Sequence, residues 1–178
     1  EDDKVLVRTI PLQHRVYTNG FLFQEKEGER RLNMDAIAQY PEIEVCDYQN
    51  IKNGKDIILE NGKTIANTEL TFEPHRPQSY AYCSDTVYLE DLATEIRGTR
   101  VIYHESTFLK INEELAAKTM HSTAYQAGLV AKNAQAEALI LGHYSSRYPD
   151  VNMFKQEAQE VFKNVLLAED GKKFVFEN

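Results

Sequence analysis

The sequence predicts one α/β domain. Its apolar runs are mostly too short for helices and end at glycine or at polar residues, as buried strands do. In the second half of the chain these runs alternate with segments in which apolar residues recur every three or four positions, as in helices that pack on a sheet. With 178 residues, of which 42% are hydrophobic, the chain is also long enough to bury a single core.

The strands are expected where branched and aromatic side chains cluster. Residues 5–10 and 20–23 should pair around a polar crossing that contains His14. Residues 139–141 are typical of a buried strand, which ends where Gly142 lets the chain turn. Further strands are expected at residues 79–83, 99–103, 165–168 and 174–176, the last two on either side of a turn at Asp170 and Gly171.

Helices are expected to join the later strands. Thr123 and Gln126 have the spacing of a capping box, which predicts the start of a helix whose inner face carries alanine and valine. The others are expected over residues 89–96, capped by Ser84 or Asp85 and ended by Gly98; over residues 112–120; and from a cap at Asn152 to Phe162.

Residues 25–54 form a separate segment, inserted between strands. Their composition is charged and irregular, apart from a short helix expected after Asn33 as N-cap. Long loops with little regular structure are either functional or disordered, and both interpretations stay open. Lys52 and Lys55 are candidate phosphate contacts, and the alternative is that they belong to a solvated face.

Composition excludes several classes of protein. Twenty basic against 28 acidic residues give a net charge of −8, which argues against nonspecific coating of nucleic acid. No apolar run approaches the roughly 18 to 20 residues that cross a bilayer, and the N-terminus lacks the pattern of a signal peptide, so we expect a cytoplasmic protein with no membrane partner. Cys46 and Cys83 lack metal-binding spacing and are expected to be free thiols.

Four ends of predicted elements carry a histidine or aspartate together with hydroxyl residues. Catalytic groups usually lie on loops that a rigid scaffold holds, so four such ends indicate a shared site. The alternative for each end, taken alone, is a polar cap. The four segments are Ser84-Asp85-Thr86, His104-Glu105-Ser106-Thr107, His121-Ser122-Thr123 and His143-Tyr144-Ser145-Ser146-Arg147-Tyr148.

These residue types suit metal-assisted phosphate chemistry. Imidazoles and carboxylates are preferred ligands of Zn²⁺ and Mn²⁺, which makes His14, Asp85 and His143 candidate metal ligands. A histidine kept protonated by a carboxylate can protonate a leaving alkoxide, and His121 with Glu105 fits that role. An arginine holds phosphate with two hydrogen bonds, so Arg147, with Ser145 beside it, is the candidate phosphate contact.

At these motifs the chain resembles the ribonuclease Z family, the tRNA 3′-processing endonucleases of the metallo-β-lactamase fold. The segments occur in the family's order, beginning with Pro11-Leu12-Gln13-His14 and Gly20-Phe21, and the resemblance covers essentially the whole chain. It implies an αββα sandwich, two zinc ions per complete site with Asp85 as their bridge, and precursor tRNA as substrate. It also implies that His104 supports the proton-transfer pair, and that residues 25–54 are a flexible tRNA-gripping arm. Lys52 in this arm and Lys55 directly after it are candidate RNA contacts.

The chain also departs from the family. The His-x-His-x-Asp-His metal cluster is absent, the arm lacks the Gly-Pro signature, and Gly142 replaces a common threonine. We therefore expect the C-terminal half of such an enzyme, with one mixed sheet, flanking helices and the inserted arm. Alone, it should bind a single zinc weakly and be inactive, and it should form a homodimer or a complex with the missing N-terminal half. The alternatives are a phosphodiesterase for small phosphodiesters and a noncatalytic binding or assembly fragment.

Overall fold

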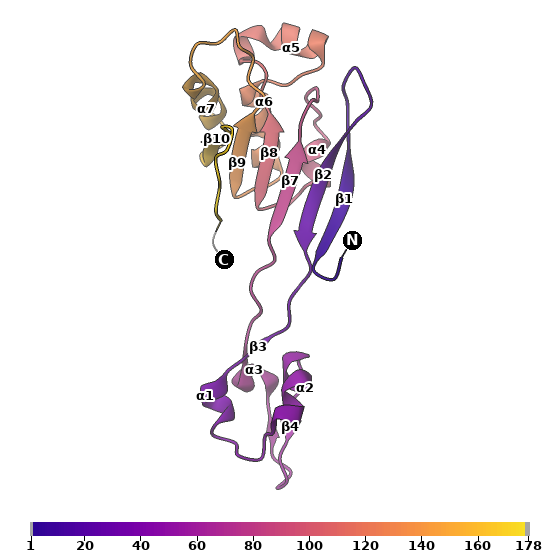
Figure 1. The fold of residues 1–178 in the computed structure, drawn as a ribbon, viewed down its shortest axis with the longest axis vertical. Coiled ribbons are helices and arrows are strands. Elements are labelled where there is room, and N and C mark those ends of the chain that lie inside the picture. The colour runs from indigo at the N-terminus through magenta and orange to yellow at the C-terminus, as the bar shows by residue number, and fades with distance from the viewer. Residues whose placement is uncertain (1, 177–178) are drawn as a thin grey trace. The chain divides into compact units, whose positions relative to one another are not determined.

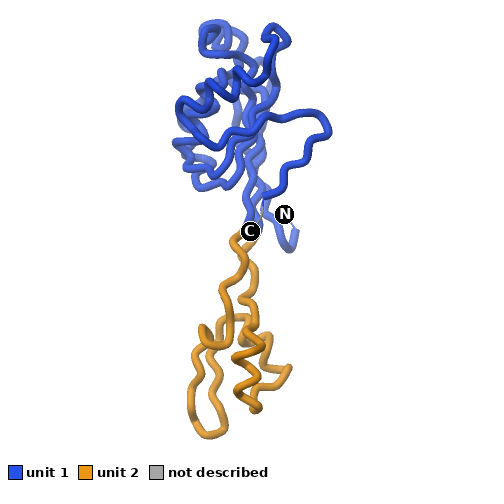
Figure 2. The backbone as a smooth tube through the Cα atoms, turned by 90° about the vertical axis from the view of Figure 1, so that its left-hand side faces the viewer, with its two compact units in different colours: residues 1–25, 78–177 blue, residues 26–77, 178 orange. Residues whose placement is uncertain are grey.

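The computed structural model describes residues 2–176, which fall into two compact units. The first unit contains the chain up to Glu25 and again from Gln78 onward, and the second contains Lys26–Pro77 (Figure 2). Each unit has its own hydrophobic core. None of the helices within residues 2–176 is long and apolar enough to cross a membrane.

The first unit is built on a mixed six-stranded sheet in the order β1-β2-β7-β8-β9-β10 (Figure 1). The first two neighbouring pairs are antiparallel, and the other three are parallel. The predicted α/β class is therefore confirmed. The strands are β1 (Val5–Leu12), β2 (Thr18–Glu25), β7 (Ser79–Cys83), β8 (Val101–Glu105), β9 (Ala138–Gly142) and β10 (Val165–Leu167).

Helices cover one face of this sheet. They are α4 (Leu92–Glu95), α6 (Ala124–Asn133) and α7 (Asn152–Gln159), whose apolar side chains pack on alternate residues of the strands, while α5 (Glu113–Thr119) lies near the upper edge in Figure 1. The capping box predicted for α6 is present: the Thr123 hydroxyl accepts from Gln126 N at 3.2 Å, and the Gln126 side chain accepts from Thr123 N at 2.9 Å.

Three local expectations were wrong. The helix predicted over residues 89–96 is only α4, and neither Ser84 nor Asp85 caps it, because Thr86 N donates to Glu105 and Val87 N donates to Gln13 instead. Asn152 is the first residue of α7 and not its cap. Residues 174–176 form no strand, since their aromatic side chains pack across the sheet.

The opposite face of the sheet is aromatic. Tyr80, Tyr103 and Ile140 cluster there with the C-terminal Phe174 and Phe176. Farther along this face the side chains of three more aromatic residues remain exposed, at 40% for Phe21, 37% for Phe23 and 37% for Tyr82. A continuous apolar surface of this kind marks a site of interaction.

The second unit is a small folded body of short elements. Buried aliphatic side chains, including Ile51, Ile65 and Leu70, form its core, and the Asn67 amide ties the loops together by donating to Ile51 O at 2.6 Å. It contains the insert predicted over residues 25–54 except Glu25, which ends β2, and it is larger because residues 55–77 pack on the same core. Its elements are β3 (Arg31–Leu32), α1 (Met34–Ile37, capped by Asn33 as predicted), α2 (Tyr48–Lys52), β4 (Ile57–Ile58), β5 (Thr64–Ile65), α3 (Asn67–Leu70) and β6 (Thr71–Phe72).

Candidate active site

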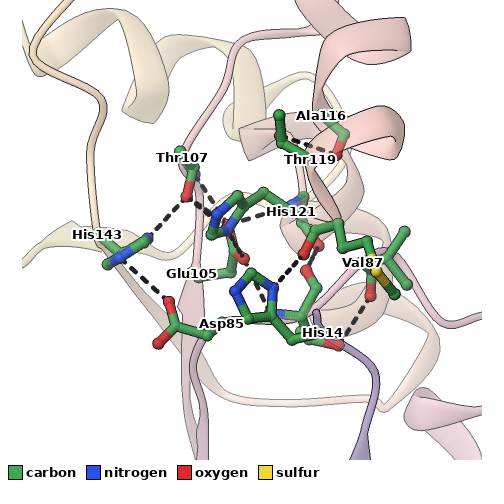
Figure 3. A network of polar contacts seen from close by, with 12 residues as sticks. His14, Asp85, Val87, Glu105, Thr107, Ala116, Thr119, His121 and His143 are labelled. Atoms are coloured by element: carbon green, nitrogen blue, oxygen red, sulfur yellow. Dashed lines mark hydrogen bonds and ion pairs between the residues drawn. The ribbon is translucent and has the colours of Figure 1, made fainter. Parts of the chain in front are cut away.

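Four polar side chains meet where β7, β8 and β9 end. Asp85, Glu105, His121 and His143 each offer a ligand atom, and these atoms all lie within 4.8 Å of one another (Figure 3). Three of the four follow or end neighbouring parallel strands, whose carboxyl ends share one edge of the sheet, and α6 begins shortly after the fourth. The site predicted from the strand-end motifs is therefore brought together by the fold.

The backbone is strained at this edge. Asp85 has a φ of 54°, Met120 of 60° and His143 of 60°, values that residues with a Cβ seldom adopt. Left-handed backbone at non-glycine residues costs of order 1–3 kcal/mol each and persists where the surroundings over-determine it. Here it turns the two side chains of Asp85 and His143 toward each other.

Glu105 is a fully buried carboxylate that accepts five hydrogen bonds. Its Oε1 accepts from Thr86 N at 2.9 Å and from His121 Nδ1 at 2.7 Å. Its Oε2 accepts from Thr107 N at 3.1 Å, from the Thr107 hydroxyl at 2.7 Å and from Ser122 N at 3.1 Å. A carboxylate offers about four lone-pair sites, so Glu105 has no lone pair left for a metal ion. Glu105 is therefore suited to orient His121 and not to bind a metal ion.

His121 is oriented by this carboxylate. Because its Nδ1 donates to Glu105, its Nε2 is the free ring nitrogen, and the side chain is 13% exposed. The hydrogen bond with Glu105 raises the pKa of the His121 imidazole above its ordinary value, although burial acts in the opposite direction. Burial pushes the pKa of Glu105 upward, but its hydrogen bonds with His121 and Thr107 hold that pKa below the ordinary value. The pair therefore favours an imidazolium beside a carboxylate.

The Thr107 hydroxyl connects the two histidines. It donates to Glu105, so it accepts from His143 Nδ1 at 2.7 Å. This leaves Nε2 of His143 facing Asp85 Oδ1 at 3.1 Å, with both side chains partly exposed. An imidazole lone pair and a carboxylate oxygen so close need a cation or a proton between them. The donor chemistry of this pair therefore fits a metal ion such as zinc.

His14 reaches the same place from the β1–β2 loop. Its Nδ1 lies 2.8 Å from Met120 O, and the ring lies 4.8 Å from the ring of His121. When Nδ1 donates to this carbonyl, Nε2 is left as the acceptor. His14 is therefore beside the cluster of four, although it is not one of them.

His104 does not reach the site edge. Its side chain is completely buried, and Nδ1 donates to the backbone oxygen of Glu105 at 2.7 Å. Burial lowers the pKa of His104, so the ring is neutral. Its Nε2 has no hydrogen-bond partner among residues 2–176. His104 is therefore a buried residue of β8, next to Glu105 in the chain.

The predicted phosphate and RNA contacts belong to different units. The Arg147 guanidinium stacks over the Phe108 ring at 4.7 Å, and its Nε donates to Ser145 Oγ at 3.0 Å. Phe108 in turn lies 6.2 Å from the His121 ring, so Arg147 borders the site. Lys52 and Lys55 belong to the second unit, where they contact Glu29 and Asn50.

The Tyr103 ring explains why residue 142 is glycine. A Cβ at Gly142 would lie 2.7 Å from both Cε2 and Cζ of Tyr103, closer than any normal contact. Tyr103 itself stacks on Tyr82 at 4.8 Å, and burial raises its pKa to about 12. The ring fills the space of a side chain at position 142, next to His143.

Replacing Gly142 with threonine should therefore destabilise the chain by about 1–3 kcal/mol, the usual cost of overpacking. Urea unfolding measures the loss. The double variant with Tyr103→Ala opens the same space and should recover part of it, as coupled neighbours do. Additive losses in the double variant would contradict the explanation.

Sequence reasoning assigned no role to two of the central groups. Thr107 bridges His121, His143 and Glu105, and its only signal was its place in the His-Glu-Ser-Thr motif. Thr86 joins the site through its backbone N and, with its hydroxyl, through Gln13 N. Both roles depend on residues distant in sequence, which a local pattern does not contain.

Curated proteins named ribonuclease Z are similar to this chain in sequence. No family model matches the chain. The ribonuclease Z of Phocaeicola vulgatus is 42% identical over 178 residues, which is all of this chain and 57% of the relative, and that of Cytophaga hutchinsonii is 43% identical over 169 residues, 94% of this chain and 53% of the relative. The chain thus spans about half the length of the curated relatives it matches.

Solved structures show the same fold. The metallo-β-lactamase fold protein YhfI of Bacillus subtilis matches with a TM-score of 0.62 at 15% identity, over 98% of this chain and 50% of that one. The short form of human tRNase Z matches with a TM-score of 0.55 at 20% identity, over 96% of this chain and 42% of that one. The chain therefore has the predicted metallo-β-lactamase fold. Within that class it is similar, over nearly its whole length, to about half of the curated proteins named ribonuclease Z.

Proposed function

We propose that the protein to which this chain belongs is a zinc-dependent endoribonuclease that removes the 3′ trailer of precursor tRNA. The relatives named ribonuclease Z support this proposal. The observation that carries it is a histidine–carboxylate dyad, His121 and Glu105, placed beside the Asp85–His143 pair. Metal-assisted hydrolysis of a phosphodiester uses a proton donor and a cation site, and these two pairs would supply one each.

The metal would be held by Asp85, His143 and His14, whose free donor atoms are one carboxylate and two imidazoles. Bound zinc would supply the nucleophilic hydroxide and charge stabilisation. These residues are too few for two complete four-ligand sites, so we propose that the remaining ligands come from the other half of the protein.

The chain's own residues would then handle the proton and the phosphate. His121 Nε2 would protonate the leaving 3′-oxygen, while Glu105 keeps the imidazole charged and fixes its tautomer. Arg147 would contact the phosphate, with Ser145 holding its Nε. His104, neutral and buried, would support the strand that carries Glu105.

The second unit is the proposed tRNA-binding arm, and its removal tests the substrate. Glu25 N donates to Gln78 O at 2.8 Å, so a short glycine–serine linker between these residues can replace Lys26–Pro77 without disturbing β2 and β7. In the complete protein, this deletion should abolish cleavage of precursor tRNA while hydrolysis of a small chromogenic phosphodiester persists, because only the large substrate reaches the arm.

A milder variant tests the role of the two lysines while the rest of the second unit stays intact. Lys52→Ala with Lys55→Ala removes only exposed contacts to Glu29 and Asn50, so the unit should stay folded. Weaker tRNA cleavage in this variant would assign the RNA contact to these lysines. Equal loss of both activities in the deletion variant would instead favour an enzyme of small phosphodiesters.

A further inference from the structure

The β1–β2 loop is anchored on the active site at its base. Val87 N donates to Gln13 O at 2.9 Å, Gln13 N donates to the Thr86 hydroxyl at 3.3 Å, and His14 Nδ1 contacts Met120 O at 2.8 Å. Figure 1 shows the loop extending past the end of β7. These hydrogen bonds fix the start of the loop relative to His121. The next three residues are Arg15, Val16 and Tyr17.

The tip of this loop presents an aromatic ring to solvent. Tyr17 is 91% exposed, more than any other large hydrophobic residue within 2–176, and Val16 is 69% exposed. The ring is held in place, because Asn19 Nδ2 donates to the Tyr17 hydroxyl at 3.1 Å and the Thr18 hydroxyl donates to Val16 O at 3.1 Å. A restrained, exposed ring beside a catalytic site is a surface on which a planar ligand can stack.

Arg15 adds a positive charge next to this ring. Arg15 directly follows His14, whose ring lies 4.8 Å from the ring of His121. No carboxylate pairs with Arg15 in the part of the chain that the structure describes. An arginine without a carboxylate partner, close to an imidazolium, is placed to receive an anion.

We propose that Arg15 and Tyr17 bind the unpaired nucleotide on the 5′ side of the scissile phosphate, and this rests on the proposed function. Tyr17 stacks on the base, and Arg15 pairs with the phosphate of the same nucleotide. The side of the bond follows from His121: it protonates the leaving 3′-oxygen, and the His14 ring that begins this loop lies 4.8 Å from it. Arg147, stacked on Phe108, comes from a different element and serves the scissile phosphate itself.

The test uses the complete protein and precursor tRNA substrates. Tyr17→Ala should raise KM by about 5- to 150-fold, the equivalent of about 1–3 kcal/mol of stacking for one base, with kcat nearly unchanged. Tyr17→Phe keeps the ring and loses only the hydrogen bond from Asn19, so KM should rise far less than in Tyr17→Ala. Val16→Ala is the matched control for loss of exposed apolar surface and should have no effect.

An abasic substrate identifies the base. When the nucleotide 5′ of the cleavage site lacks its base, Tyr17→Ala should raise KM no further, whereas an abasic nucleotide on the 3′ side should leave the full effect. Arg15→Ala should raise KM for both abasic substrates, because it contacts phosphate. An equal effect of Tyr17→Ala on intact and 5′-abasic substrates would overturn the proposal.

Two further outcomes separate the possible failures. If the unsubstituted protein does not cut precursor tRNA, the proposed function fails, and this inference fails with it. If it cuts normally and Tyr17→Ala has an unchanged KM, only this inference fails. A raised KM that accompanies dissociation of an oligomer in sedimentation would also overturn it, since the loop would then belong to a protein interface.

Discussion

Replacing His121 with alanine in the complete protein should lower turnover of precursor tRNA by about 100-fold or more while the metal content stays constant. The variant removes the proposed proton donor for the leaving 3′-oxygen. Glu105 keeps its other four hydrogen-bond donors, so the fold around it should survive. Single-turnover kinetics with metal analysis on the same samples measures both quantities.

The alternative role of His121 makes this experiment decisive. A histidine whose Nδ1 donates to a buried carboxylate is also the usual form of a metal-binding histidine. If metal content falls together with activity in His121→Ala, then His121 is a ligand and the assignment as a proton donor is wrong. His143→Ala is the matched control, because its loss should lower metal content, whichever role His121 has.

The 178-residue chain on its own should bind at most one zinc ion weakly and should not cleave precursor tRNA. Its free donors at the site are the Asp85 carboxylate and the imidazoles of His14 and His143, too few for two four-ligand sites. Calorimetric titration with zinc and a cleavage assay check the two parts. Two stoichiometric zinc ions, or cleavage by the purified chain, would contradict this expectation.

Adding the N-terminal half in trans should restore cleavage. The aromatic face of the sheet is the proposed docking surface, because the resemblance to ribonuclease Z implies a second sheet and this face carries exposed Phe21 and Phe23. Without the other half, the chain should self-associate through the same face, which sedimentation at micromolar concentration would detect. No recovery of activity on mixing would favour a noncatalytic binding or assembly fragment.

A single variant links this surface to activity. Phe23→Glu places a charge on the aromatic face, where the side chain is already 37% exposed, so the isolated chain should remain folded. The variant should not form the complex and should not recover cleavage. Normal complementation by Phe23→Glu would show that the two halves associate elsewhere.

The sequence alone determined those features that depend on neighbours in the chain. Short apolar runs located the strands, and local hydrogen-bonding side chains located two helix starts, at Asn33 and at Thr123. The sequence also located the polar motifs that the fold brings together, because these motifs follow neighbouring parallel strands whose ends meet at one edge.

Tertiary structure decided what these residues do. Five donors from three loops saturate Glu105, and the left-handed backbone of Asp85 and His143 brings their side chains to 3.1 Å; a local pattern contains neither fact. The Tyr103 ring accounts for Gly142 in the same way. Caps and strand signals act within a few residues, whereas hydrogen-bond saturation, side-chain exclusion and backbone strain arise only when distant segments pack together.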